Sequence, residues 1–340
     1  MKRYFYFSLP IAFLFIISLV SPSTGLYRSP EMPTIPKSKN YRWIERNLDS
    51  SMNNIVTVSY GNGTWIAGGI AGSFIASPNG MDWRNLEPGF ATTSILASEY
   101  DGSNMWVIGG STGKIAWSKD GHHFTLSDSK FGHNTSNFVF DIDINNKGQW
   151  IAVGAGGKLS SSRDGIEWKL RDAQFGNSTI RAITHNKSEL WIIAGAEGKL
   201  AVSEDGHHWK HKNSSFGQSE SYDVECNKFK CVAIGQHGKI AISSDGNHWK
   251  QVKSGFGNNN INTVAHSAKN LWMVGGDNGQ VASSTDGIKW KSIDIGFKNY
   301  SIRKLLHNGK LWVAAGDNGL LATSEDGEKW TLRKSNLKKE

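Results

Sequence analysis

LWVAAGDNGLLATSEDGEKW, residues 311–330, is the stretch that decides the fold, because variants of it occur seven times along the chain. Each variant opens on a tryptophan column, continues through two glycines, and ends on Ser-x-Asp-Gly, with Asn79 in place of Asp in the first unit, followed three residues later by an aromatic residue. The opening column holds Trp65, Trp106, Trp150, Trp191, Cys231, Trp272 and Trp312. The closing aromatics are Trp83, Phe124, Trp168, Trp209, Trp249, Trp290 and Trp330, at steps of 41, 44, 41, 40, 41 and 40 residues. Such a period indicates one small structural unit per repeat, stacked on its neighbours.

Each unit divides into four short apolar stretches separated by turn residues. Two glycine columns lie between the second and third stretches, and we expect both to supply a positive φ in a tight turn. The first holds Gly69, Gly110, Gly154, Gly195, Gly235, Gly276 and Gly316, and the second Gly72, Gly113, Gly157, Gly198, Gly238, Gly279 and Gly319. In the Asp-Gly turn, the Asp side chain is expected to accept backbone N–H groups. The pattern predicts an all-β chain, a seven-bladed β-propeller of four-stranded antiparallel sheets.

The units resemble the BNR or Asp-box repeats of sialidase-type propellers, and resemble still more the repeats of photosystem II assembly-factor propellers. The shared pattern is W-x-x-G-x-x-G followed by S-x-D-G-x-x-W, and it covers residues 41 to 334. The chain departs from the usual Asp box, because every unit lacks the extra residue between Asp and Gly. The resemblance implies a propeller that binds proteins, or one that acts on glycans in the sialidase branch, and it does not choose between them.

The chain ends predict the domain organisation. Residues 1–25 begin with Lys2 and Arg3 and continue with an apolar run too short to span a bilayer, which predicts a cleaved signal peptide rather than a membrane anchor. Residues 26–40 contain three prolines and predict a linker, and residues 335–340 form a basic tail. The propeller is expected over 41–334, with Tyr41 to Leu48 either closing the ring or packing elsewhere. We therefore expect a secreted or periplasmic protein with no membrane span after cleavage.

The overall composition bounds the class of partner. The chain has 340 residues, a hydrophobic fraction of 38% and a formal net charge of +8. This hydrophobic fraction is enough for a globular core. The charge permits acidic partners, but no long Lys/Arg run accompanies it, so nucleic acid is not expected.

The two cysteines, Cys226 and Cys231, lie on either side of an expected hairpin. Cysteines facing each other across a hairpin reach disulfide geometry, and export lets the bond persist. Cys231 also stands in the opening tryptophan column, so we interpret the bond as a replacement for a large packing residue. Two buried thiols are the alternative.

Candidate site residues are found where the repeats differ, in the first stretch of each unit. Aligning these stretches places six polar residues side by side on the fourth to seventh units, at the expected channel mouth: Arg181, Tyr222, Asp223, Asn262, Arg303 and Lys304. A pair of arginines can bind a carboxylate or a phosphate. The alternative is that these residues only line a water-filled channel or form local ion pairs.

A sialidase-like enzyme would need three arginines, a tyrosine nucleophile with a glutamate partner, and an acid. The set is incomplete, although Tyr222 has Asp223 and Glu225 nearby. No catalytic residue is therefore assigned. The histidines recur in turns on separate units, so we expect solvated turn residues, no metal site and no cofactor.

Two further sets recur in the loops. The first predicts a basic arc after the second glycine, for an acidic partner or simply for solvent: Lys114, Lys158, Lys199 and Lys239. The second is expected to wedge between blades, or to stack on sugars if exposed: Phe131, Phe175, Phe216 and Phe256. The sequence favours an exported, monomeric, non-enzymatic scaffold for a protein partner, an assembly or adhesion factor. Glycan binding or sialidase-like glycoside hydrolysis is the alternative.

Overall fold

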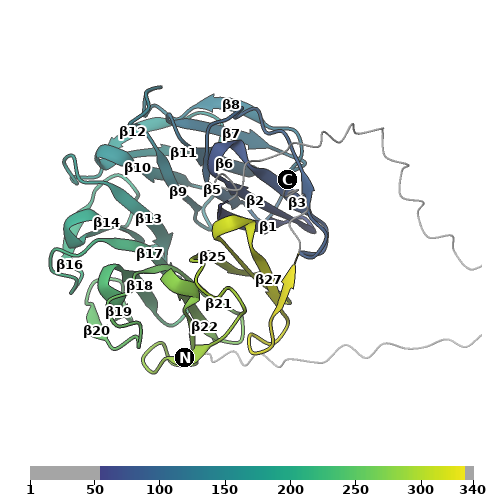
Figure 1. Cartoon of the computed structure of the whole chain (residues 1–340). Coiled ribbons are helices and arrows are strands. Elements are labelled where there is room, and N and C mark those ends of the chain that lie inside the picture. The colour runs from purple at the N-terminus through teal and green to yellow at the C-terminus, as the bar shows by residue number, and fades with distance from the viewer. Residues whose placement is uncertain (1–53, 334–340) are drawn as a thin grey trace, which may run out of the picture. The chain divides into compact units, whose positions relative to one another are not determined.

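The chain is a seven-bladed β-propeller, as a computed structural model that describes residues 54–333 shows. Seven four-stranded antiparallel sheets, or blades, surround a central axis (Figure 1), which confirms the predicted fold class. The predictions for the signal peptide, the linker, Tyr41 to Leu48 and the tail concern residues outside the described range. No helix among residues 54–333 has the length and apolar character needed to cross a membrane.

Every blade is one continuous stretch of chain, with its strands in sequence order from the axis to the rim. Blade 1 comprises β1 (Ile55–Gly61), β2 (Thr64–Gly69), β3 (Phe74–Ser77) and β4 (Arg84–Asn85). Blade 2 comprises β5 (Ile95–Tyr100), β6 (Trp106–Gly110), β7 (Lys114–Ser118) and β8 (Thr125–Asp128). Blade 3 comprises β9 (Val139–Ile144), β10 (Trp150–Gly154), β11 (Lys158–Ser162) and β12 (Lys169–Asp172). Blade 4 comprises β13 (Ile180–His185), β14 (Trp191–Gly195), β15 (Lys199–Ser203) and β16 (Lys210–Asn213). Blade 5 comprises β17 (Ser221–Cys226), β18 (Cys231–Gly235), β19 (Ile240–Ser243) and β20 (Lys250–Val252). Blade 6 comprises β21 (Ile261–His266), β22 (Trp272–Gly276), β23 (Val281–Ser284) and β24 (Lys291–Ile293). Blade 7 comprises β25 (Ile302–His307), β26 (Trp312–Gly316), β27 (Leu321–Ser324) and β28 (Thr331–Arg333).

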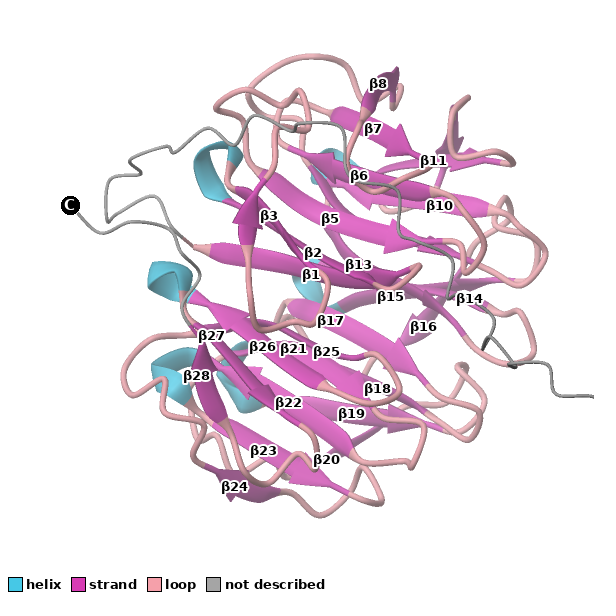
Figure 2. Cartoon of the chain, turned by 90° about the vertical axis from the view of Figure 1, so that its right-hand side faces the viewer, coloured by secondary structure: helices cyan, strands magenta, loops and turns pink. Residues whose placement is uncertain are grey.

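Short 3-10 turns join the second and third strands in six blades and lie toward one side of the ring in Figure 2. They are η1 (Ile70–Gly72), η2 (Ala155–Gly157), η3 (Ala196–Gly198), η4 (Gln236–Gly238), η5 (Asp277–Gly279) and η6 (Asp317–Gly319). The loops that join consecutive blades lie at this same end of the strands, which we call the loop face. The hairpins between first and second strands lie at the opposite end with the Asp-Gly turns, and we call that end the hairpin face.

The two glycine columns differ in their reason for being glycine. The second column has positive φ throughout, from 64 to 77°, as predicted. The prediction of positive φ is wrong for the first column, which is extended, as at Gly154 with φ −176°. There a Cβ would lie only 1.8 to 2.1 Å from a carbonyl oxygen just before or at the start of the blade's first strand. The first column is therefore glycine because two backbones approach too closely for any side chain.

The Asp-Gly turns have the hydrogen bonds that the sequence predicts. In blade 5, Asp245 Oδ1 accepts the backbone N–H groups of the second and third residues after it, at 2.8 and 2.9 Å. Ser243 Oγ donates to the same Asp245 oxygen at 3.0 Å and accepts the Gly246 N–H at 2.8 Å. The Trp249 indole N–H then donates to the Gly246 carbonyl at 3.0 Å, which folds the ring back onto the sheet. These local bonds explain why Ser, Asp, Gly and Trp recur together.

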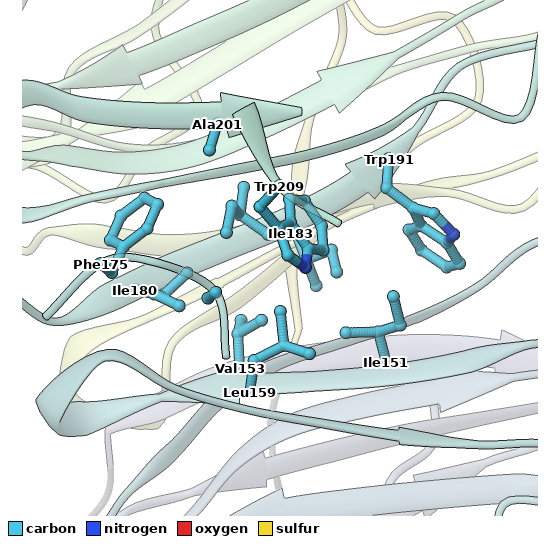
Figure 3. Packing of buried hydrophobic residues seen from close by; sticks show 11 residues of the cluster. Ile151, Val153, Leu159, Phe175, Ile180, Ile183, Trp191, Ala201 and Trp209 are labelled. Carbon is cyan, nitrogen blue, oxygen red and sulfur yellow. The ribbon is translucent and has the colours of Figure 1, made fainter. Parts of the chain in front are cut away.

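The core consists of seven apolar clusters, each at one joint between adjacent blades in the described ring. Figure 3 shows the joint of blades 3 and 4, where Trp209 lies beside Ile183 and close to Val153 and Leu159 of the preceding blade. Phe175, from the loop between the two blades, is 1% exposed in the same cluster. A single blade could not bury these rings, so the stacking of blades stabilises each unit.

Within the described residues, packing between blades 1 and 7 closes the ring. Trp65 and Trp83 of blade 1 share a buried cluster with Val313 and Leu321 of blade 7. A hydrogen bond crosses the same joint, from the Asn318 backbone N–H to the Asn54 side-chain Oδ1 at 2.9 Å. The outer strand of blade 7 is β28, which directly follows Trp330 and pairs with β27.

Candidate functional site

A cavity of about 500 Å³ lies on the propeller axis and is lined by the first strands of the blades. All six residues predicted at the channel mouth line this cavity. They come from β13, β17, β21 and β25, which are innermost in their sheets (Figure 1). The structure therefore brings the predicted residues together, and their binding role stays a prediction.

A β-bulge explains why two successive residues on each first strand reach the cavity. The pairing register with the second strand shifts at the second residue of the first strand in all seven blades, as between Ile180 and Ala182. A bulge places an extra residue opposite one partner and re-aims its side chain. Tyr222 and Asp223 consequently both line the cavity, although neighbouring residues of a regular strand point to opposite faces.

The residues at the loop-face mouth are held in place by carboxylates. Arg181 Nε donates to Glu220 Oε1 at 2.6 Å, and its guanidinium lies 4.5 Å from the centre of the Phe140 ring. Arg303 binds both oxygens of Asp317, at 2.8 and 3.2 Å. The two arginine side chains remain 34% and 37% exposed. The mouth thus presents two oriented, partly exposed guanidinium groups.

Asn262 and Tyr222 complete this mouth. The Asn262 amide donates to Asp277 Oδ1 at 3.0 Å and to the Ile302 carbonyl at 3.1 Å, so its position is fixed. Tyr222 packs partly against the apolar cluster between blades 5 and 6. Aromatic, amide and guanidinium groups therefore surround one opening, with apolar Phe140 beside them.

Deeper in the channel, one lysine faces several carboxylates. Lys304 Nζ lies 3.8 Å from Asp223 Oδ2. Burial opposes the charge on Lys304, but Asp223 and Asp141 outweigh it and raise the pKa of the amine. Burial raises the pKa of Asp141 to about 7, against the opposing effect of Lys304, and burial together with Asp143 raises the pKa of Glu99 to about 8. The channel therefore retains protons near neutral pH.

A second cavity of about 450 Å³ continues toward the hairpin face and shares several of these residues. Its walls carry two acid–histidine pairs, His185 Nδ1 with Asp143 Oδ2 at 2.8 Å and His266 Nε2 with Glu225 Oε1 at 3.5 Å. Burial alone would lower the pKa of both histidines, but the partner carboxylates raise it above the ordinary value. The prediction of solvated turn residues is wrong for these two histidines and for His307, because all three end first strands and line the channel cavities.

The sequence reasoning missed most of this acidic interior. Glu99, Asp143 and Glu225 each lie two positions after the residue that aligns with Asp223, and therefore on the same side of the first strand. Of these, only Glu225 was noted from the sequence, as a neighbour of Tyr222; continuing the alignment by two residues, the period of side-chain alternation in a strand, also identifies Glu99 and Asp143. Within residues 54–333, no group of three or more His, Cys, Asp or Glu side chains is arranged to hold a metal ion.

The lysines of the predicted basic arc help to join the blades. Lys114 Nζ donates to the Phe90 carbonyl at 3.1 Å, and Lys239 Nζ to the Phe216 carbonyl at 2.6 Å. Lys158 and Lys199 bind the corresponding carbonyls of Phe131 and Phe175. All four side chains are half-buried. They therefore fix the loops between blades, and an additional role in docking stays a prediction.

The loop phenylalanines are buried, between 0 and 4% exposed. This confirms the wedge between blades and removes the condition under which they would stack on sugars. Phe90 and Phe297 are equivalent wedges in the loops after blades 1 and 6. The Phe-Gly pattern did not identify them, because the residue after the phenylalanine is not glycine in these two loops.

Cys226 and Cys231 form a disulfide, as predicted, with Cα atoms 4.0 Å apart. They are paired across β17 and β18 at the position where five other blades stack a Tyr or His ring on the opening tryptophan, with ring centres 4.7 to 5.4 Å apart. The covalent bond thus replaces an aromatic pair. The turn histidines His123, His208 and His248 are exposed and contact the Asp of their own turns.

These features define the class of protein, a repeat-built propeller with an axial polar channel. The family model of the DUF6242 beta propeller domain matches residues 218–331. No curated protein matches the chain. Among solved structures, YCF48 bound to D1 peptide is similar at 17% identity and a TM-score of 0.64, covering 86% of this chain and 98% of that one.

Two further solved structures illustrate the range of this fold. YCF48 from Cyanidioschyzon merolae has 12% identity and a TM-score of 0.65, covering 82% of this chain and 97% of its own. Virginiamycin B lyase from Staphylococcus aureus has 9% identity and a TM-score of 0.64, covering 72% and 85%. At these identities the likeness establishes the fold alone.

Proposed function

We propose that the chain is an exported, non-enzymatic propeller that binds a peptide segment of a partner protein at the loop-face mouth of its channel, as an assembly or adhesion factor. The observation that carries the proposal is the pair of guanidinium groups of Arg181 and Arg303, fixed by carboxylates and still partly exposed. A guanidinium group has five N–H donors, so the donors of Arg181 and Arg303 that Glu220 and Asp317 do not occupy remain for a ligand carboxylate.

The surroundings of the two arginines suit a peptide better than a small anion. Phe140 and Leu96 line the same cavity as Tyr222 and Asn262, so it offers apolar and hydrogen-bonding contacts in addition to the charged groups. Binding sites commonly combine an apolar wall with a few fixed polar groups. The similar propeller YCF48 has been solved with a bound peptide, which supports a peptide ligand for this fold.

The test is a selection of random 12-residue peptides on the purified full chain, followed by fluorescence anisotropy with the enriched peptides. We expect enriched peptides to carry a carboxylate, and Arg181→Ala and Arg303→Ala to weaken their binding at least tenfold. Arg171→Ala is the matched control, because Arg171 bonds Ser161 on the outer part of blade 3, away from the channel. Equal binding by all three variants would contradict the proposal.

Two further measurements separate the alternative activities. Turnover of a fluorogenic sialoside, or binding on a glycan array, would favour the glycan alternative over the protein scaffold. Export is tested by expressing the whole chain in a bacterial host and measuring the mass of the exported protein. Cleavage near residue 25 is expected, and retention of the leader would contradict it.

A further inference from the structure

The hairpin face carries a second, exposed set of lysines, unrelated to the half-buried basic arc. In blades 3 to 7 the hairpin between the first and second strands has one exposed lysine at its tip, and these are Lys147, Lys187, Lys228, Lys269 and Lys310. The corresponding tips of blades 1 and 2 contain no lysine. Because the five blades are consecutive, the lysines form a crescent round one side of the hairpin-face opening.

The hairpin of blade 5, in the middle of this crescent, is more rigid than a short loop alone. The disulfide joins its two strands at the base. Asn227 Oδ1 accepts the backbone N–H groups of Phe229 and Lys230, both at 2.9 Å. Lys230 Nζ donates to the Asp286 carbonyl of blade 6, which ties the tip to the neighbouring blade. The tip therefore has a fixed conformation before any partner arrives.

This fixed tip presents an aromatic ring to solvent. Phe229 is 55% exposed, and Lys228 Nζ lies 4.9 Å from the centre of its ring. Exposed rings held in one conformation are typical anchors of protein interfaces, because little side-chain entropy is lost on binding. None of the six other tips carries an aromatic residue at its turn.

A pocket of about 360 Å³ lies between blades 4 and 5, beside Phe229. Leu190 and the disulfide residue Cys231 contribute apolar atoms to its wall, and Lys187 and Lys228 line it as well. Glu204 and Asp245 also line the pocket, but the Asp245 carboxylate is engaged by its own turn and by His248 at 2.6 Å. The charge available to a partner is therefore mainly that of the lysines.

We propose that the hairpin crescent, defined as Phe229 with Lys147, Lys187, Lys228, Lys269 and Lys310, is a docking surface for an acidic segment of a partner protein that inserts an apolar side chain beside Phe229. The lysines supply charge complementarity, which speeds association and selects acidic partners. The concave pocket favours a protein segment over a lipid surface, because a membrane would not fill it. This site lies on the face opposite the arginine-lined mouth and is independent of it.

The experiment uses the full chain with its disulfide intact. Random 12-residue peptides are selected on the wild type with counter-selection on Phe229→Ala, and the enriched peptides are measured by fluorescence anisotropy. We expect peptides rich in Asp and Glu around one apolar residue, with affinity that falls as NaCl is raised. Phe229→Ala and the double variant Lys187→Glu/Lys228→Glu should each weaken binding at least tenfold.

Matched controls separate docking from general charge or apolar effects. Leu126→Ala removes a side chain of similar exposure, 52%, from the outer strand of blade 2, and Lys169→Glu/Lys291→Glu changes two exposed lysines of outer strands. Both should bind within twofold of the wild type, and thermal unfolding checks that every variant is folded. Failure to enrich acidic peptides, or equal binding by Phe229→Ala, overturns the proposal. Binding to vesicles of 30% phosphatidylserine without an acidic peptide consensus also overturns it and assigns the face to a membrane surface.

Discussion

Replacing Gly154 by alanine tests the reason for the first glycine column. Gly154 is extended, so alanine has no difficulty with its φ of −176°. The added Cβ would lie 1.8 Å from the Phe138 carbonyl oxygen and 2.8 Å from the Phe131 ring. The Phe138 oxygen must therefore move until it is about 3.0 Å from the new Cβ. This movement disturbs the hydrogen bond that the oxygen accepts from Ala155 N at 3.0 Å.

The expected cost follows from two contributions. Loss of one buried backbone hydrogen bond costs about 1 kcal/mol or more. Forcing two packed segments apart costs about 1–3 kcal/mol. Gly154→Ala should therefore lower the free energy of unfolding by roughly 3 kcal/mol. The disturbance also reaches Phe131, the wedge between blades 2 and 3, so the loss is not confined to one turn.

Gly156→Ala, two residues away, is the matched control. Gly156 has a φ of 65°, and a Cβ there would meet nothing within 4 Å. Other blades have Ala71, Glu197 and His237 at this position, also with positive φ. The control should therefore cost only about 1 kcal/mol, the strain of a left-handed residue.

The assay is urea unfolding of the wild type and both variants, followed by tryptophan fluorescence. The midpoint should fall clearly further for Gly154→Ala than for Gly156→Ala. If the two midpoints fall equally, or the order is reversed, close backbone approach is not the reason for glycine in this column.

Three further predictions concern stability. Asp205→Ala leaves two backbone N–H groups of its turn without their acceptor and should lower the free energy of unfolding by about 2 kcal/mol. The control Glu204→Ala, at the neighbouring exposed residue, should change it little, and thermal unfolding measures both variants. Replacing Cys226 and Cys231 by serine should cost about 2 kcal/mol, since the closed loop is short, and dithiothreitol should no longer change the urea midpoint of that variant. Folding raises the pKa of the Glu99 carboxyl from its ordinary value of 4.5 to about 8, so the folded chain keeps a proton that the unfolded chain loses between these values. Stability should therefore fall as pH rises through this window, and Glu99→Gln should flatten the fall; an unchanged pH profile would contradict this.

The fold could be predicted from the sequence because its determinants are local and repeated. The bonds of Asp245, Ser243 and Trp249 all lie within seven residues, so their spacing appears directly in the sequence. The disulfide was predictable for the same reason, as Cys226 and Cys231 are separated by five positions. Local geometry repeated at a regular period left few alternatives to a propeller.

The site was predictable only in part, because its properties arise from several blades together. The varied column identified Arg181 and Arg303, but not the carboxylates Glu220 and Asp317 that hold them. The pKa of Glu99 depends on Asp143 of another blade and on burial in the channel, which no single unit contains. The half-buried state of the basic-arc lysines likewise depends on carbonyl groups from the preceding loops.

Each sheet of this ring is a self-contained module, because its four strands follow one another without exchange with the next sheet. Duplication or loss of one repeat would therefore add or remove a whole blade without changing how any other strand pairs. The ring could change its number of blades, and with it the width of the axial channel, in single genetic steps. Size variation among such rings would then come from copy number rather than from the rebuilding of any one sheet.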